Sequence, residues 1–294
     1  MEFCEQVYQA VREHDLIRRG DRVLAAVSGG ADSVCLLLVL DKIRQDLQKQ
    51  GKPSFELALV TVDHGIRGEA SAGDVAFADQ LGRRLGLPCF VFHEDVPALV
   101  RQEHLSEEEA ARAVRYRCFA KAARKWQADS VAVAHNKDDQ VETVLLNLLR
   151  GSGLTGLAGL SWSRTLKTSG PEFGPIVQEP GDCSQECGAG GSPGGEEMDE
   201  IRVIRPLLDM SRGEIEAWLS QIGQPFRTDE SNLEDHHTRN RLRHHVIPLM
   251  EQEINRNARE HIASAASDLA QAAAFAESSA AEWLEKHEAL DWFS

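Results

Sequence analysis

The sequence lacks any long apolar run. None of its hydrophobic stretches approaches the ~18 to 20 residues that a membrane span needs. Residues 1–15 alternate charged and apolar side chains, where a secretory signal would show an apolar block. We therefore expect no membrane association and a cytoplasmic location.

Positive charge is also scarce. Lys and Arg together number 32 against 47 Asp and Glu, which gives a net charge of −15. This balance excludes a protein that holds nucleic acid by bulk positive charge. Any contact with RNA must come from local basic patches.

Cysteines at metal-binding spacing are absent. Four of the six cysteines lie inside apolar or helical patterns, where a small buried thiol fits. Only Cys183 and Cys187 form a pair, spaced C-x3-C, and no second Cys or His pair at zinc spacing stands nearby. We therefore expect neither a structural zinc site nor a redox pair.

What the sequence does contain is an alternation of short β-branched runs with longer helical patterns. Such alternation is typical of an α/β fold with a doubly wound, mostly parallel sheet covered by helices. The predicted strands are 22–27, 57–62, 89–93, 130–134 and 201–204. The predicted helices are 33–50, 72–85, 107–126 and 138–149, with a shorter one from Ser211 to about Gly223.

The chain of 294 residues exceeds what one hydrophobic core usually serves, so we expect two domains. The first covers 1–223 and includes a Gly/Pro-rich insertion at 168–200, which we predict to be a mobile surface loop. The second covers 224–294 and is a linker followed by a smaller α-helical C-terminal domain. The abrupt end at Ser294 is consistent with a truncated helical domain.

The strongest local signal is the loop Val27-Ser28-Gly29-Gly30-Ala31-Asp32-Ser33, between a predicted strand and a predicted helix. Adjacent glycines, successive N–H groups, two hydroxyls and a helix N-terminus together make a site for phosphate or pyrophosphate. Asp32 would repel phosphate unless a divalent cation lay between them, so Mg²⁺ is implied. The alternative is a tight turn with Asp32 or Ser33 as a helix cap. The loop matches neither G-x-x-x-x-G-K-[ST] nor G-x-G-x-x-G.

A second polar cluster follows the fourth predicted strand and comprises His135, Asp138, Asp139 and Glu142. Glu142 shares a helix face with either aspartate. Because clustered carboxylates repel one another, a metal ion or an ammonium group is the expected partner.

A third cluster, Asp63, His64 and Arg67, follows the second predicted strand. Parallel strands bring their carboxyl ends to one edge of a sheet, where ligands bind in open α/β folds. We therefore expect all three clusters to form one site, with Asp63 or His64 near a base or ribose and Arg67 near phosphate or RNA.

These stretches together resemble the tRNA(Ile)-lysidine synthetase family, within the PP-loop ATP pyrophosphatase superfamily. The resemblance covers about residues 20–260. It is carried by SGGADS, VDHGIRGEAS, AHNKDDQVETVLLNLLRGSGLTGLAGL, RAVRY (112–116), RPLL (205–208), DESN (229–232) and RNRLR (239–243). It implies an adenine nucleotide alpha hydrolase-like PP-loop fold for the first domain.

The resemblance also implies a reaction. Family members use ATP to adenylate the wobble cytidine of an isoleucine tRNA with a CAU anticodon, releasing pyrophosphate, and L-lysine then displaces AMP to give lysidine. ATP and Mg²⁺ would be required. The helical C-terminal domain would contact tRNA. The oligomeric state stays open at this point, with a homodimer as one candidate.

Roles for individual residues follow from the same resemblance. The residues expected to bind ATP are Val27, Ser28, Gly29, Gly30, Ala31, Asp32, Ser33, Asp63 and His64. Asp32, His135, Asp138, Asp139 and Glu142 are expected to be catalytic, with Asp32 and Asp139 on the metal, and His135 or one of the acids as the base. The residues expected to contact lysine or tRNA are Arg67, Arg112, Arg115, Asp138, Glu142, Arg205, Arg239, Arg241 and Arg243. Which acid binds Mg²⁺ and which binds lysine stays open.

Two other functions are compatible with a PP-loop. A PP-loop tRNA thiolase would adenylate a base in the same way, but the paired C-x-x-C usual in thiolases is missing. A noncatalytic tRNA-binding protein of the same fold would have no use for Asp32 and the acids that follow the fourth strand.

Overall fold

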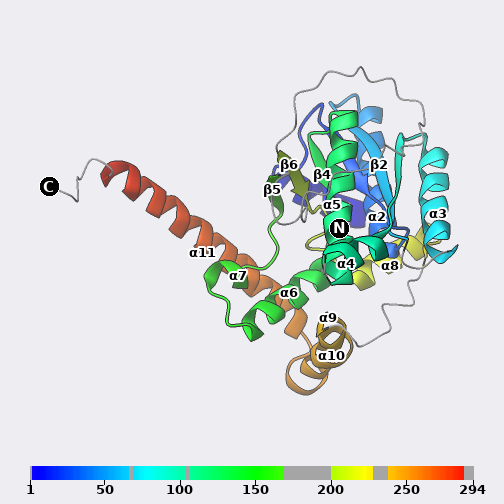
Figure 1. Ribbon diagram of the computed structural model, residues 1–294. Coiled ribbons are helices and arrows are strands. Elements are labelled where there is room, and N and C mark those ends of the chain that lie inside the picture. The colour runs from blue at the N-terminus through cyan, green and yellow to red at the C-terminus, as the bar shows by residue number, and fades with distance from the viewer. Residues whose placement is uncertain (1, 66–68, 104–105, 168–199, 228–237, 288–294) are drawn as a thin grey trace. The chain divides into compact units, whose positions relative to one another are not determined.

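The computed structural model describes residues 2–65, 69–103, 106–167, 200–227 and 238–287 (Figure 1). The chain forms two compact units. The first unit contains Met1–Asn136 and Trp162–Asp229, and the second contains Lys137–Ser161 and Glu230–Ser294. The division into 1–223 and 224–294 differs from this grouping chiefly in residues 137–161. As a division into functional domains, it stays a prediction.

The first unit is built on a six-stranded sheet with the strand order β3-β2-β1-β4-β6-β5. Every neighbouring pair is parallel except β5 with β6. The strands are β1 (Arg22–Ala26), β2 (Glu56–Asp63), β3 (Cys89–His93), β4 (Ser130–Ala132), β5 (Ser163–Lys167) and β6 (Glu200–Ile204). The mostly parallel sheet predicted from the sequence is therefore confirmed.

Helices cover both faces of this sheet. They are α1 (Phe3–Glu13), α2 (Ala31–Lys49), α3 (Glu69–Leu85), α4 (Val96–Glu103), α5 (Glu107–Trp126) and α8 (Arg212–Gln221). Successive side chains of a strand point to opposite faces. Accordingly, Val23 of β1 packs with Val34 of α2, whereas the next residue, Leu24, packs with Phe119 of α5. Burial on both faces explains why the strands read as continuous apolar runs.

In the first unit, the structure adds elements that were not predicted from the sequence, namely α1, α4 and β5. β5 lies at the edge of the sheet, and Leu166 is its one fully buried side chain, so its sequence carries little strand signal. The predicted loop at 168–200, with Cys183 and Cys187, lies outside the described residues except for Glu200, which begins β6.

The second unit is helical. Its elements are α6 (Lys137–Leu149), α7 (Leu154–Leu157), α9 (Thr238–Arg241), the π-helix η3 (Leu242–Val246), α10 (Ile247–Leu249), the π-helix η4 (Met250–Ile254) and α11 (Ala258–His287). Its core joins Val141 and Leu145 of α6 to Leu242 and Ile247. The helical character predicted for the C-terminal region is confirmed.

Candidate nucleotide-binding site

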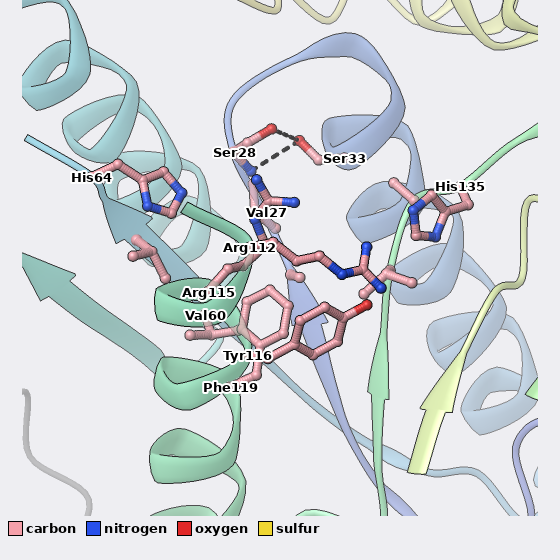
Figure 2. Close-up of a pocket in the computed structure, with 14 residues that line it drawn as sticks. Val27, Ser28, Ser33, Val60, His64, Arg112, Arg115, Tyr116, Phe119 and His135 are labelled. Carbon is pink, nitrogen blue, oxygen red and sulfur yellow. Dashed lines mark hydrogen bonds between the residues drawn. The ribbon is translucent and has the colours of Figure 1, made fainter. Parts of the chain in front are cut away.

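The loop between β1 and α2 is fixed by its own hydrogen bonds. The Ser33 hydroxyl accepts from the Ser28 backbone N–H (3.1 Å) and donates to the Gly30 carbonyl (2.9 Å). The hydroxyl oxygens of Ser28 and Ser33 lie 3.2 Å apart (Figure 2). Gly29 has a φ of +90°, a conformation that costs little only for glycine. The predicted phosphate loop is thus a preformed turn.

Helix α2 begins directly behind this turn. Its N-cap residue is Gly30, which offers no side-chain cap, so neither Asp32 nor Ser33 is the cap of the helix. No side chain at the N-cap therefore caps the N–H groups of the first helical turn, and the helix dipole adds positive potential there. An anion is the expected occupant.

A cavity of about 180 Å³ lies beside the loop (Figure 2). One part of its lining is apolar and includes Val60, Val62, Phe119 and Val133. Its polar lining residues are Ser28, Ser33, His64, Arg112, Arg115, Tyr116 and His135. An apolar wall with a few hydrogen-bonding groups next to a phosphate loop suits a nucleotide.

The charged residues that line this cavity are all basic. None of the described residues that line it is acidic, and two arginines of α5, Arg112 and Arg115, contribute to it. The guanidinium carbon of Arg112 lies 5.0 Å from the centre of the Tyr116 ring, a cation–π distance that orients the side chain (Figure 2). The cavity therefore favours an anionic ligand.

His135 lines the cavity from the loop that follows β4. The Nε–H of Arg205 donates a hydrogen bond to its Nδ1 at 3.2 Å. Arg205 is buried, with 5% of its surface exposed, and this burial lowers the pKa of its guanidinium from the ordinary value. Arg205 thus reaches the ligand cavity through His135.

The carboxylate of Asp32 lies in the first turn of α2 and forms an ion pair with Arg212 of α8, with Nη1 and Oδ2 separated by 3.2 Å. Arg212 was not predicted from the sequence: no motif marks it, because the pair joins positions 180 residues apart. Arg212 also pairs with Glu216 at 2.9 Å. The structure therefore shows that a cation can occupy the space beside Asp32.

Among the described residues, no group of three or more His, Cys, Asp or Glu side chains is arranged to enclose a metal ion. Mg²⁺ that arrives with a nucleotide needs only one or two carboxylates, since phosphate oxygens and water complete its shell. Asp32, beside the two serine hydroxyls of the loop, supplies oxygen donors of that kind. These residues fit nucleotide-bound Mg²⁺.

The two described polar residues at the end of β2, Asp63 and His64, have different surroundings. His64 lines the cavity, whereas the Asp63 carboxylate accepts a hydrogen bond from the Gly65 N–H (2.9 Å) and lies 3.4 Å from His93 Nδ1. Asp63 therefore shapes the turn in this structure. Arg67 lies outside the described residues.

The acidic cluster of α6 belongs to the second unit. Glu142 is buried there, and its two carboxylate oxygens accept from Arg243 Nε at 2.6 Å and Nη2 at 3.1 Å. Burial raises the pKa of Glu142 above its ordinary value, and the hydrogen bond from Arg243 acts in the opposite direction. Arg239 Nε lies 3.5 Å from the same carboxylate.

The two aspartates also have arginine partners in this unit. Arg243 Nη2 lies 3.5 Å from Asp139 Oδ1, and Arg259 pairs with Asp138. Arg259 was not predicted, and only its place in the helical tail could have suggested it. Arg241 instead donates to the Thr238 hydroxyl at 3.1 Å and is exposed. That these acids serve the same site as the phosphate loop stays a prediction.

The sequence model of the family described as the PP-loop domain matches residues 2–250 of this chain. The chain belongs to the PP-loop domain family. The match agrees with the PP-loop fold that the sequence predicted. Separately, no described helix is long and apolar enough to cross a membrane.

Curated relatives confirm the resemblance to tRNA(Ile)-lysidine synthases. The chain is 36% identical to the synthase of Caldanaerobacter subterraneus subsp. tengcongensis over 248 residues, which are 84% of this chain and 44% of the relative. It is 36% identical to that of Geobacillus kaustophilus over 282 residues, or 96% and 52% of the two chains. The chain thus spans about half the length of the curated relatives it matches.

Among solved structures, the chain is similar to a U34-tRNA thiolase from Methanococcus maripaludis that carries a [4Fe-4S] cluster. The TM-score is 0.63 at 16% identity, and the match covers 91% of this chain and 79% of the thiolase. At that identity the similarity shows a shared fold.

Proposed function

We propose that this chain ligates L-lysine to C2 of the wobble cytidine in an isoleucine tRNA with a CAU anticodon, forming lysidine. The observation that carries this proposal is the preformed phosphate loop beside a cavity that has an apolar wall and no acidic lining among the described residues. The sequence relatives named tRNA(Ile)-lysidine synthases supply the choice of substrates. The reaction belongs in the cytoplasm, where ATP, lysine and tRNA meet.

The first step forms a bond between O2 of cytidine and the α-phosphorus of ATP, and the bond to pyrophosphate breaks. Ser28, Ser33 and the N–H groups at the start of α2 would bind the departing phosphates. Arg112 and Arg115 would neutralise negative charge in the cavity. Such a transfer depends mainly on positioning and charge stabilisation, which a rigid loop provides.

Asp32 would hold Mg²⁺, with Asp139 as a further candidate ligand. When bound, Mg²⁺ supplies charge neutralisation for the phosphates. Arg212 pairs with Asp32 in this structure, so its guanidinium would add positive charge beside the residue that would hold the metal.

In the second step the lysine amine attacks C2 of the activated cytidine, and the C2–O bond breaks as AMP leaves. Asp138, Asp139 and Glu142 are the candidates for holding the ammonium group before it loses a proton. Each of these acids now pairs with an arginine, so lysine would have to compete with Arg243 or Arg259. Arg239, Arg241 and Arg243 are the proposed tRNA contacts.

The test incubates the chain with ATP, Mg²⁺, labelled lysine and the tRNA transcript, and measures AMP and labelled tRNA. We expect both products, neither of them with Asp32→Ala, and no labelled product from a transcript whose wobble cytidine is replaced by uridine. AMP formed only when a sulfur donor is present would indicate a thiolase. Binding of tRNA with no AMP under any condition would indicate a noncatalytic binder.

A further inference from the structure

The hydrogen bond between Arg205 and His135 defines which nitrogen of the histidine carries the proton. A guanidinium has only N–H donors and accepts no hydrogen bond. Because Arg205 Nε–H donates to His135 Nδ1 at 3.2 Å, Nδ1 must present its lone pair. The imidazole is then neutral, and its single proton lies on Nε2.

The two residues are held by the sheet. Arg205 directly follows β6, and its backbone N–H donates to the Trp162 carbonyl at 2.9 Å. His135 is anchored in a similar way after β4. The N–H of Val133, two residues before His135, donates to the carbonyl of Ile204 in β6 at 2.9 Å. Only 5% of the Arg205 surface is exposed, so its side chain has little freedom to leave the imidazole.

The cavity that His135 lines determines which kind of ligand its Nε2–H can meet. His135 and His64 stand on opposite sides of the phosphate loop in Figure 2, and the described cavity lining contains arginines and no acids. A ligand bound there is therefore an anion that presents oxygen acceptors. An Nε2–H group is the form of histidine that can donate to such an oxygen.

We propose that Arg205 is a positioning residue that fixes His135 in the Nε2–H tautomer, so that His135 donates a hydrogen bond to a phosphate oxygen of the nucleotide. This inference rests on the proposed function for the identity of the ligand. In this state Nε2 has no lone pair and Nδ1 is occupied by Arg205. His135 is therefore not the base that takes the lysine proton, and that task falls to the carboxylates.

Substitutions of His135 can show whether the side chain acts as a hydrogen-bond donor or as a general base. The amide nitrogen of glutamine reaches the position of Nε2 and can donate, but it takes up no proton at neutral pH. We expect His135→Gln to keep the rate of ATP–pyrophosphate exchange with tRNA within about tenfold of the wild type. His135→Ala should lose roughly 10²-fold or more, the size of effect seen when one donor to a developing charge is removed. Equal losses in both variants would overturn the proposal.

The control is His93→Gln, which makes the same change at a histidine whose side chain is 59% exposed and which does not line the cavity. We expect its exchange rate to stay within twofold of the wild type. A loss as large as that of His135→Ala would show that histidine loss acts through folding, and would overturn the assignment.

The tautomer itself is observable by NMR of the chain labelled with ¹⁵N-histidine. The His135 signals, identified by their disappearance in His135→Gln, should show a proton on Nε2 and none on Nδ1. Arg205→Met should produce a mixture of both tautomers, and Arg205→Lys should restore part of the Nε2–H form. A protonated imidazolium or an Nδ1–H tautomer in the wild type overturns the proposal. The wild-type spectrum alone decides this, so the test does not depend on whether the Arg205 variants fold.

The failure of this inference is distinguishable from failure of the proposed function. The NMR experiment is repeated with a non-hydrolysable ATP analogue and neither lysine nor tRNA. A shift of the Nε2–H signal on binding supports the inference even if no lysine is ever incorporated into tRNA. Binding of the analogue, measured by calorimetry, without any change in that signal overturns it.

Discussion

Glu142 is a buried charge whose counter-charges come from a distant part of the chain. Its side chain is 1% exposed and receives both hydrogen bonds of the Arg243 fork, at 2.6 and 3.1 Å. Removing one partner of a buried ion pair leaves the other charge desolvated and uncompensated. We therefore expect Glu142→Gln to lower the free energy of unfolding by about 3 kcal/mol, measured by urea denaturation.

Glu260→Gln is the matched control, because it makes the same change in the same unit at a side chain that is 59% exposed. Glu260 pairs with Lys137 at 3.0 Å, and an exposed pair of this kind contributes about 1 kcal/mol or less. The prediction is wrong if the two substitutions cost equally. It is also wrong if Glu142→Gln leaves the denaturation midpoint unchanged.

Helix α8 depends on its first residues. Ser211 caps it by accepting from the Glu214 N–H at 3.3 Å, while the Glu214 carboxylate accepts from the Ser211 N–H at 2.8 Å. Loss of such a cap typically costs about 1 kcal/mol. We expect Ser211→Ala to lower the free energy of unfolding by about that amount, and Ser211→Thr, which keeps the hydroxyl as acceptor and as donor to Glu214 Oε2, to lower it by much less. Equal denaturation curves for the two variants would contradict the capping role.

The sequence predicted those elements whose signal is local. The predicted helices that start near Ser106 and Ser211 are real, and each begins with a capping box. The buried strands around Leu24 and Leu59 were found because both of their faces are apolar. The edge strand β5 was missed because it buries little. Its polar pattern resembles that of a loop.

The candidate site divides in the same way. The phosphate loop was predictable because Gly29 and the two serines lie within one short stretch. Arg212 and Arg259 were not, since each meets its aspartate from more than a hundred residues away. Pairings of that kind are set by tertiary structure, and no spacing in the sequence encodes them.

Considered over its full length, the molecule is an acidic protein with a proposed polyanionic substrate. Against a net charge of −15, the described stretch 238–245 contains three arginines, two histidines and no acid. A locally basic surface on an acidic protein favours contact at one place and discourages nonspecific binding elsewhere. Within that stretch Arg243 is committed to Glu142, whereas Arg241 is exposed.

Arg241 is therefore the side chain that tests the basic stretch as an RNA contact. Each phosphate contact releases counterions, so losing one lowers the slope of log Kd against log salt concentration by about 0.7 to 1. We expect Arg241→Gln to weaken tRNA binding severalfold at low salt and to reduce the slope by this amount in filter-binding titrations. Arg150→Gln removes one exposed positive charge from the same unit outside the stretch, and it should leave the slope unchanged. Equal slopes for the wild type and Arg241→Gln would mean that tRNA is bound elsewhere on the protein.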